Sequence, residues 1–306
     1  MLLRVARICG VALLFVLAVV TIVLWRDPQL RHELWADWSY DIGEPDKSVP
    51  AAPLSKNGLA TRFAVIGDFG TGDEEAQRTA EVMARLDARR DFDAVIMLGD
   101  NVYPNGDPEL VDEVVLEPLE DTLDDDTKLL AALGNHDVRD GNGDGQVEAL
   151  GLPGRWYATD FDQVLVITLD STMADNSDQR TFLETTLAGS DARWKVAMMH
   201  HPPYSSGYHG SDDATRSAFV DLFERYGVDL VLAGHDHDYQ RSEPIGSVTY
   251  VVSGASAKKR PAHRASFTEV AWSTFHLVDL AVYSNRLEGR AIDHEGRVFD
   301  QFILRN

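Results

Sequence analysis

The sequence predicts an α/β layered domain that ends in an antiparallel section and follows one N-terminal transmembrane helix. Short continuous apolar runs alternate with helical patterns up to about residue 232, and from residue 247 onward the pattern is of strands alone. These two observations predict the domain. An uncharged apolar run near the N-terminus predicts the transmembrane helix.

The apolar runs and the stretches between them place the elements in order. Strands are expected at residues 63–66, 94–98, 129–133, 164–169, 196–199 and 228–232, because short continuous apolar runs are typical of strands buried on both faces. Helices are expected at residues 74–89, 179–188 and 214–226. The antiparallel section is expected to contain strands at residues 248–252, 274–282, 286–292 and 298–303.

The N-terminal run, residues 8–25, carries no charge and would span roughly the hydrocarbon thickness of a bilayer as a helix. No small-x-small cleavage sequence follows it, so an uncleaved anchor is favoured over a cleaved signal peptide. We expect an anchor or signal-anchor at residues 1–30, a proline-containing tether at 31–60 and a catalytic domain at 61–306. The domain is expected to be exported to the periplasmic or extracellular side, with secretion after cleavage as the alternative.

The composition of the 306-residue chain excludes several classes of function. With 28 Lys+Arg against 50 Asp+Glu, the net charge is −22, which argues against a nucleic-acid-binding protein. An anionic substrate would therefore need strong local cations. The single cysteine, Cys9, lies in the apolar run, so disulfide frameworks, cysteine zinc sites and cysteine nucleophiles are excluded.

Side chains that can bind metals follow five of the expected strands. In open α/β sheets the ligand site lies beyond the carboxyl ends of the strands, so these residues are expected to share one crevice. The sequences are Gly67-Asp68-Phe69-Gly70, Gly99-Asp100-Asn101-Val102-Tyr103, Gly134-Asn135-His136-Asp137, His200-His201-Pro202-Pro203 and Gly234-His235-Asp236-His237.

Oxygen and imidazole ligands suit hard-to-intermediate divalent or trivalent metals rather than copper(I) or an iron–sulfur cluster. Because one carboxylate can bridge two ions, these side chains are enough for two metals. Two-metal sites stabilise the attacking and leaving oxygens of a phosphoryl displacement. They also supply the positive field that this acidic protein otherwise lacks.

In this order, the motifs resemble the metallophosphoesterase (calcineurin-like) superfamily. Gly-Asp-x-x-Tyr at 99–103 and Gly-His-x-His at 234–237 resemble the purple acid phosphatases, also called tartrate-resistant acid phosphatases. The resemblance covers residues 62–305. It implies a four-layer αββα sandwich of two mixed β-sheets flanked by helices.

The resemblance also implies a role for each ligand. A ferric ion would be held by Asp68, Tyr103 and His237. A second ion, divalent iron, zinc or manganese, would be held by Asn135, His200 and His235. Asp100 would bridge the two.

The same resemblance implies the residues that contact substrate. His136 would contact the substrate phosphate. His209, in Tyr208-His209-Gly210, would position the phosphate or protonate the leaving oxygen. His201 is expected at the rim of the site.

The implied function is a binuclear-metal phosphomonoesterase of the acid phosphatase type, which hydrolyses phosphate esters by attack of a metal-bound hydroxide. The alternatives are a phosphodiesterase or nucleotide hydrolase of the same superfamily, and a membrane-tethered binding module with a degenerate site. The expected partners are the phosphate-ester substrate and, through the N-terminal helix, a membrane.

Two weaker patterns remain open. The basic run Lys258-Lys259-Arg260 either lies near the site, where it would attract a second anionic group of the substrate, or forms a solvated loop. Residues 140–145 resemble the first half of a calcium loop, but Gly151 stands where the bidentate glutamate would be. A glycine-rich turn is the alternative there.

Overall fold

A computed structural model describes Pro45 and residues 48–55 and 58–305 of the chain. The predicted anchor at residues 1–30 and part of the predicted tether lie outside these described residues. Among the residues described, none of the helices combines the length and the apolar character that crossing a bilayer requires.

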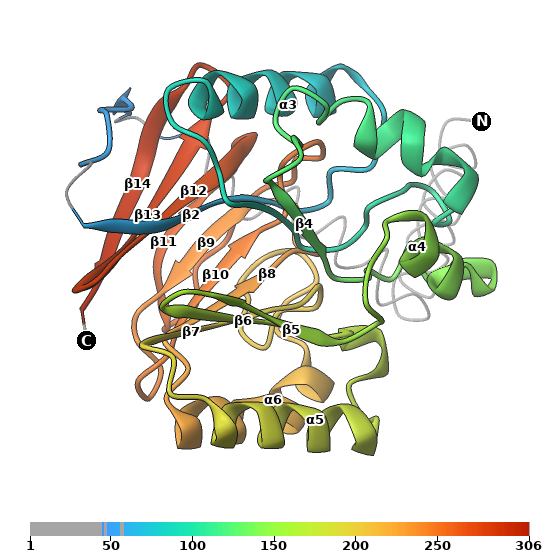
Figure 1. The fold of residues 1–306 in the computed structure, drawn as a ribbon, viewed down its shortest axis with the longest axis vertical. Helices are drawn as coiled ribbons and strands as arrows, with labels where there is room; N and C mark the ends of the chain where they lie inside the picture. Colours follow the sequence, from blue (N-terminus) through green and yellow to red (C-terminus); the bar gives the residue numbers. More distant parts are fainter. Residues whose placement is uncertain (1–44, 46–47, 56–57, 306) are drawn as a thin grey trace, which may run out of the picture. The chain divides into compact units, whose positions relative to one another are not determined.

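The described strands form two seven-stranded mixed sheets, which confirms the mixed two-sheet α/β prediction (Figure 1). The first sheet runs in the order β1 (Val49–Pro50), β14 (Arg297–Leu304), β13 (Arg286–Asp293), β12 (His276–Tyr283), β2 (Leu59–Ile66), β3 (Ala94–Met97), β4 (Lys128–Ala131). The second runs in the order β11 (Thr268–Trp272), β9 (Tyr239–Ser242), β10 (Thr249–Ser253), β8 (Leu230–Ala233), β7 (Trp194–Met198), β6 (Val164–Thr168), β5 (Tyr157–Phe161).

Helices cover the outer faces of both sheets, as Figure 1 shows. Helix α3 (Glu74–Asp87) packs on the first sheet, and α5 (Ser177–Gly189) and α6 (Asp213–Tyr226) pack on the second. Helix α4 (Gly143–Ala149) and short 3₁₀ turns at Pro108–Leu110, Arg139–Gly141 and Ser171–Met173 lie in the connections, with a π-helical turn at Asp112–Leu116.

The apolar runs are continuous because each buried strand faces two cores. On β2, Phe63 and Val65 point into the core between the sheets, whereas Ala64 and Ile66 point into the core beneath α3. Alternate side chains of a strand point to opposite faces of the sheet, so the residues on both faces of the strand must be apolar.

Four strands and one helix of the described residues were not predicted: β1, β5, β9, β11 and α4. Strand β9 has the sequence Tyr-Gln-Arg-Ser, which shows no apolar run, and yet all four residues are buried. It pairs antiparallel with both β10 and β11, and this pairing, rather than the local sequence, determines its conformation. The strand predicted at 274–282 runs from His276 to Tyr283.

Candidate metal centre

The predicted site residues follow five strands that pair parallel to a neighbour, three in the first sheet and two in the second. Because their carboxyl ends lie at the same edge, the side chains after them converge. Asp68 follows β2, Asp100 and Tyr103 follow β3, Asn135 and His136 follow β4, His200 follows β7, and His235 and His237 follow β8.

The backbone at three of these residues lies in the left-handed region that L-amino acids rarely adopt. The φ angles are 56° at Asp68, 52° at Asp100 and 72° at His235. Such conformations persist only where the surrounding structure enforces them, and they cluster at functional sites. The strand ends also approach closely, since a Cβ on Gly234 would lie 2.7 Å from Asp68 Oδ2.

One group of side chains consists of Asp68, Tyr103 and His237. The Tyr103 hydroxyl donates to Asp68 Oδ1 at 3.1 Å and lies 3.4 Å from His237 Nε2. His237 Nε2 in turn lies 3.3 Å from Asp68 Oδ1. The three predicted ligands of the first ion are therefore mutual neighbours.

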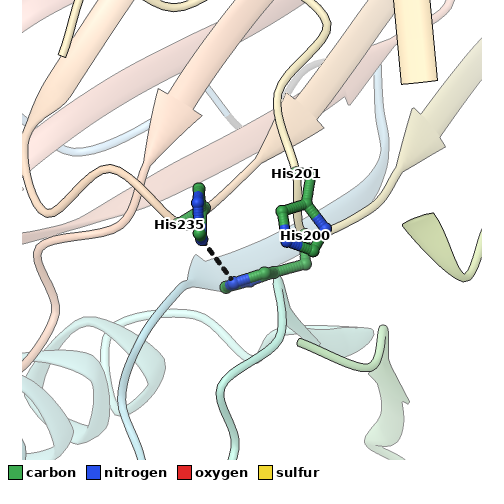
Figure 2. A group of neighbouring side chains, drawn as sticks. All are labelled: His200, His201 and His235. Atoms are coloured by element: carbon green, nitrogen blue, oxygen red, sulfur yellow. Dashed lines mark hydrogen bonds between the residues drawn. The ribbon is translucent and has the colours of Figure 1, made fainter. Parts of the chain in front are cut away.

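The second group surrounds Nε2 of His200. This nitrogen lies 3.0 Å from Asn135 Oδ1 and 3.1 Å from His235 Nδ1. Figure 2 shows the His200–His235 hydrogen bond, with the ring of His201 beside the pair. The three predicted ligands of the second ion are therefore also brought together.

Asp100 lies next to both groups. Its Oδ1 is 3.5 Å from His200 Nε2 and accepts the His136 backbone N–H at 2.9 Å. Burial, with the charge of nearby Asp100, holds the pKa of Asp68 well above its usual range. Two buried carboxylates this close repel each other unless a cation lies between them.

These donors fit a metal centre of hard-to-intermediate ions. The ligand atoms of Asp68, Asp100 and His200 lie within 4.8 Å of one another, as do those of His200, His201 and His235. Burial keeps the pKa of His200 well below its usual value, so the ring is neutral, as metal binding requires. Burial also raises the pKa of Tyr103, which would ionise only beside a strong cation.

The two predicted substrate-contacting histidines lie at this centre. His136 Nδ1 donates to the Pro104 carbonyl oxygen at 2.6 Å, and its Nε2 lies 3.9 Å from Asp100 Oδ2. The ring centroid of His209 lies 4.3 Å from that of His235. Burial, with the nearby charge of Arg260, lowers the pKa of His209 to about 4.

Two aspartates inside the motifs hold the site together, although sequence reasoning gave them no role. The Asp137 carboxylate accepts the backbone N–H groups of Asn101, Val102 and Gly134, which joins the segments that follow β3 and β4. Asp236 accepts the His209 backbone N–H at 2.7 Å. The only signal in the sequence was the place of each aspartate beside a predicted ligand.

His201 and the 140–145 segment also have defined contacts. His201 Nδ1 lies 2.9 Å from Ser171 Oγ. In the possible calcium loop, Asp140 accepts a hydrogen bond from Asn105, and Asp144 pairs with Arg155 at 2.8 Å. Asp140 lies in the 3₁₀ turn at Arg139–Gly141 and Asp144 lies in the first turn of α4, so the two acids belong to different helical turns rather than to one open loop.

Comparisons with known proteins agree with this geometry. The calcineurin-like phosphoesterase family matches residues 61–239. Purple acid phosphatase 17 of Arabidopsis thaliana is 27% identical over 241 residues, which is 67% of this chain and 70% of that protein. Human tartrate-resistant acid phosphatase type 5 is 28% identical over 246 residues, 67% of this chain and 75% of that protein.

A solved structure shares the fold. Purple acid phosphatase PPD1 from yellow lupin superposes with a TM-score of 0.70 at 21% identity, over 83% of this chain and 55% of the lupin chain. The family match covers more than half of the sequence and includes the ends of all five strands that the predicted ligands follow. The chain therefore belongs to the calcineurin-like phosphoesterase family and is a hydrolase of phosphoric ester bonds.

Proposed function

We propose that this protein is a binuclear-metal phosphomonoesterase of the acid phosphatase type. The observation that carries the proposal is the division of the predicted ligands into two groups with Asp100 beside both. Tyr103 favours the purple acid phosphatase branch, because a tyrosine beside Asp68 and His237 provides a hard anionic oxygen for a ferric ion.

The first group would hold a ferric ion and the second a divalent iron, zinc or manganese ion. When bound, such a pair activates water as a nucleophile at or below neutral pH and neutralises charge on the phosphoryl oxygens. The protein contributes ligand orientation. His200 Nδ1 donates to the Leu98 carbonyl oxygen at 2.9 Å. In the neutral ring, Nε2 is therefore unprotonated, and this nitrogen faces the metal centre.

His136 would act on the substrate from the side of the first ligand group, and His209 from the side of the second. His136 lies against Tyr103, with ring centroids 4.4 Å apart. Because Nδ1 donates to Pro104, Nε2 accepts in the neutral ring and would donate to the phosphate only when the ring carries both protons. His209 lies beside His235 and is held through its backbone by Asp236. We infer that His136 orients the phosphate and that His209 serves the phosphate or the leaving oxygen.

Hydrolysis of an aryl phosphate monoester should be compared with that of its bis-aryl diester, from acid to neutral pH, with the full-length metal-loaded chain. Faster cleavage of the monoester with an acidic optimum supports the proposal. Preference for the diester, or a neutral-to-alkaline optimum that needs added manganese, would place the activity elsewhere in the family. The Asp100→Asn variant provides the background rate.

We further propose that residues 8–25 tether the enzyme to a membrane with the catalytic domain on the exported side. The support is the uncharged run itself. Fractionation of the full-length chain tests this. Recovery in the membrane fraction after a carbonate wash is expected, and a shortened soluble chain would show cleavage instead.

A further inference from the structure

The basic run Lys258-Lys259-Arg260 lies in the connection between β10 and β11, and the backbone of this connection is fixed against the metal centre. The Ser256 N–H donates to the Gly67 carbonyl oxygen at 3.2 Å, and the Arg260 N–H donates to the carbonyl oxygen of His237 at 2.8 Å. The Arg260 carbonyl oxygen accepts from Ser273 Oγ at 2.8 Å. This segment is held on both sides rather than being a solvated loop.

The side chains of the run alternate in direction. The Lys258 ammonium lies 4.0 Å from the ring centroid of Tyr103, a member of the first ligand group. Arg260 Nη1 donates to His209 Nε2 at 2.9 Å, beside the second group. Between them, Lys259 is directed elsewhere, with its ammonium 5.1 Å from the ring of Phe275.

Lys258 and Arg260, hereafter the cationic pair, therefore lie beside the two halves of the centre. Both are half-buried, which strengthens their fields relative to exposed cations. The Arg260 guanidinium also lies 4.4 Å from the Tyr208 ring centroid, which limits its rotation. A guanidinium has five N–H donors in a fixed plane, so one bond to His209 leaves donors able to bind an anion.

The acidic composition gives this arrangement its significance. At a net charge of −22, the protein repels a polyanionic substrate except where cations are concentrated locally. Two metal ions would neutralise the phosphoryl group that reacts. They would leave any additional phosphoryl group of the substrate without a partner unless side chains provide one.

We propose that the cationic pair binds a second phosphoryl group attached to the one that is cleaved, and so favours diphosphate-type substrates over simple monoesters. This inference rests on the proposed phosphomonoesterase function of the adjoining centre. Arg260 would bind the second group through paired N–H donors, and Lys258 would contribute as a point charge. The pair are specificity residues rather than members of the metal centre.

The test compares pyrophosphate with p-nitrophenyl phosphate, which has no second anionic group, in the full-length metal-loaded enzyme. Arg260→Ala and Lys258→Ala should each lower the ratio of kcat/KM for pyrophosphate to that for p-nitrophenyl phosphate about tenfold, mainly through KM. Arg260→Lys should recover part of the loss. Lys259→Ala is the matched control: it removes the same charge from the next position and should leave the ratio unchanged.

A binding measurement separates this inference from catalysis. Calorimetry with methylenediphosphonate, which is not hydrolysed, should show about tenfold weaker binding to Arg260→Ala, while binding of inorganic phosphate changes much less. Metal content and thermal unfolding of each variant exclude a misfolded site. The inference is overturned if Arg260→Ala loses the same affinity for methylenediphosphonate as for inorganic phosphate, or if it loses affinity for neither. A wild-type enzyme that binds the diphosphonate through the pair but hydrolyses no monoester would instead refute the proposed function.

Discussion

The Nδ1 atom of His200 lies 2.9 Å from the carbonyl oxygen of Leu98, so a histidine that follows β7 in one sheet is held by the residue that follows β3 in the other. A carbonyl oxygen accepts only, which fixes the proton on Nδ1 and directs the lone pair of Nε2 toward Asn135 and His235. This contact predetermines the geometry of the second ligand group before any metal binds.

The two ligand groups should lose their metals separately. We expect His200→Ala to retain about one metal per chain, because His200 belongs to the second group only, and His237→Ala to lose the other ion. Asp100→Asn should lose both ions, since Asp100 adjoins both groups. Elemental analysis after dialysis measures the occupancy, and full binuclear occupancy of Asp100→Asn would refute the bridging role.

Tyr103→Phe should remove the visible charge-transfer band expected of a phenolate bound to ferric iron, while the fold is retained. The phenyl ring can fill the same space beside His136, and only the hydroxyl that reaches Asp68 is lost. Absorption spectra of the iron-loaded wild type and variant make the comparison. A band of unchanged position and intensity would show that Tyr103 is not a ligand.

Asp236 should act through the position of His209. Its Oδ1 accepts the His209 N–H at 2.7 Å, and its Oδ2 accepts from the hydroxyl of Ser205. Ser205→Ala removes the second bond without altering a neighbour of His235 or His237 along the chain. It also removes the bonds that Ser205 Oγ accepts from the Gly207 N–H and from Gln240 Nε2, both at 2.9 Å, which help to hold the same loop. We expect kcat to fall about tenfold with both metals retained, since a misplaced catalytic group commonly costs this much or more.

The readouts for Ser205→Ala are steady-state kinetics and metal content. Ser190→Ala is a suitable control, because Ser190 caps the end of α5 and bonds only locally, to the N–H of Ala192. A fall in metal content that matches the fall in kcat would assign Asp236 to the metal centre itself.

The buried His276 should make the metal-free protein less stable in acid. Burial lowers the pKa of His276 to about 4, from an unfolded value near 6.5, and its ring is enclosed between Ser253 Oγ and the Thr274 carbonyl oxygen. Below the unfolded pKa the unfolded chain binds the extra proton first, so stability falls as the pH drops from about 6.5 toward 4.

From neutral pH to about pH 5, the contribution of His276 comes to about 2 kcal/mol of unfolding free energy. Denaturant unfolding of the wild type and His276→Gln at both pH values measures it. The variant should be less stable at neutral pH but lose about 2 kcal/mol less on acidification. If acidification lowers the free energy of unfolding equally in the wild type and in His276→Gln, then His276 is not the source of the acid sensitivity.

Sequence reasoning reached the strand ends because each one carries a local pattern: an apolar run followed by a polar side chain, with a glycine between them at four of the five. Asp68, Asn135 and His235 follow their strands in this way, and the parallel topology brings them together. The continuous apolar runs required a core on both faces of the strands, whereas the division into two sheets was implied only by the family resemblance.

What sequence could not provide depends on contacts between distant residues. Arg260 and His209 are separated by 51 positions, and no local pattern indicates that their side chains meet. The same holds for β9, whose Arg241 is buried because it pairs with Asp300 at 2.7 Å. Polar residues that are buried only by their partners have no hydrophobic signature.

The centre draws Asp68, Asp100, Tyr103 and Asn135 from one sheet and His200, His235 and His237 from the other. Each ion would therefore cross-link the two halves of the sandwich, and folding and metal uptake would be thermodynamically linked. A free metal concentration a hundredfold above the dissociation constant adds about 2.7 kcal/mol to stability. A cell that withholds the metal would then reduce both the activity and the lifetime of the folded protein.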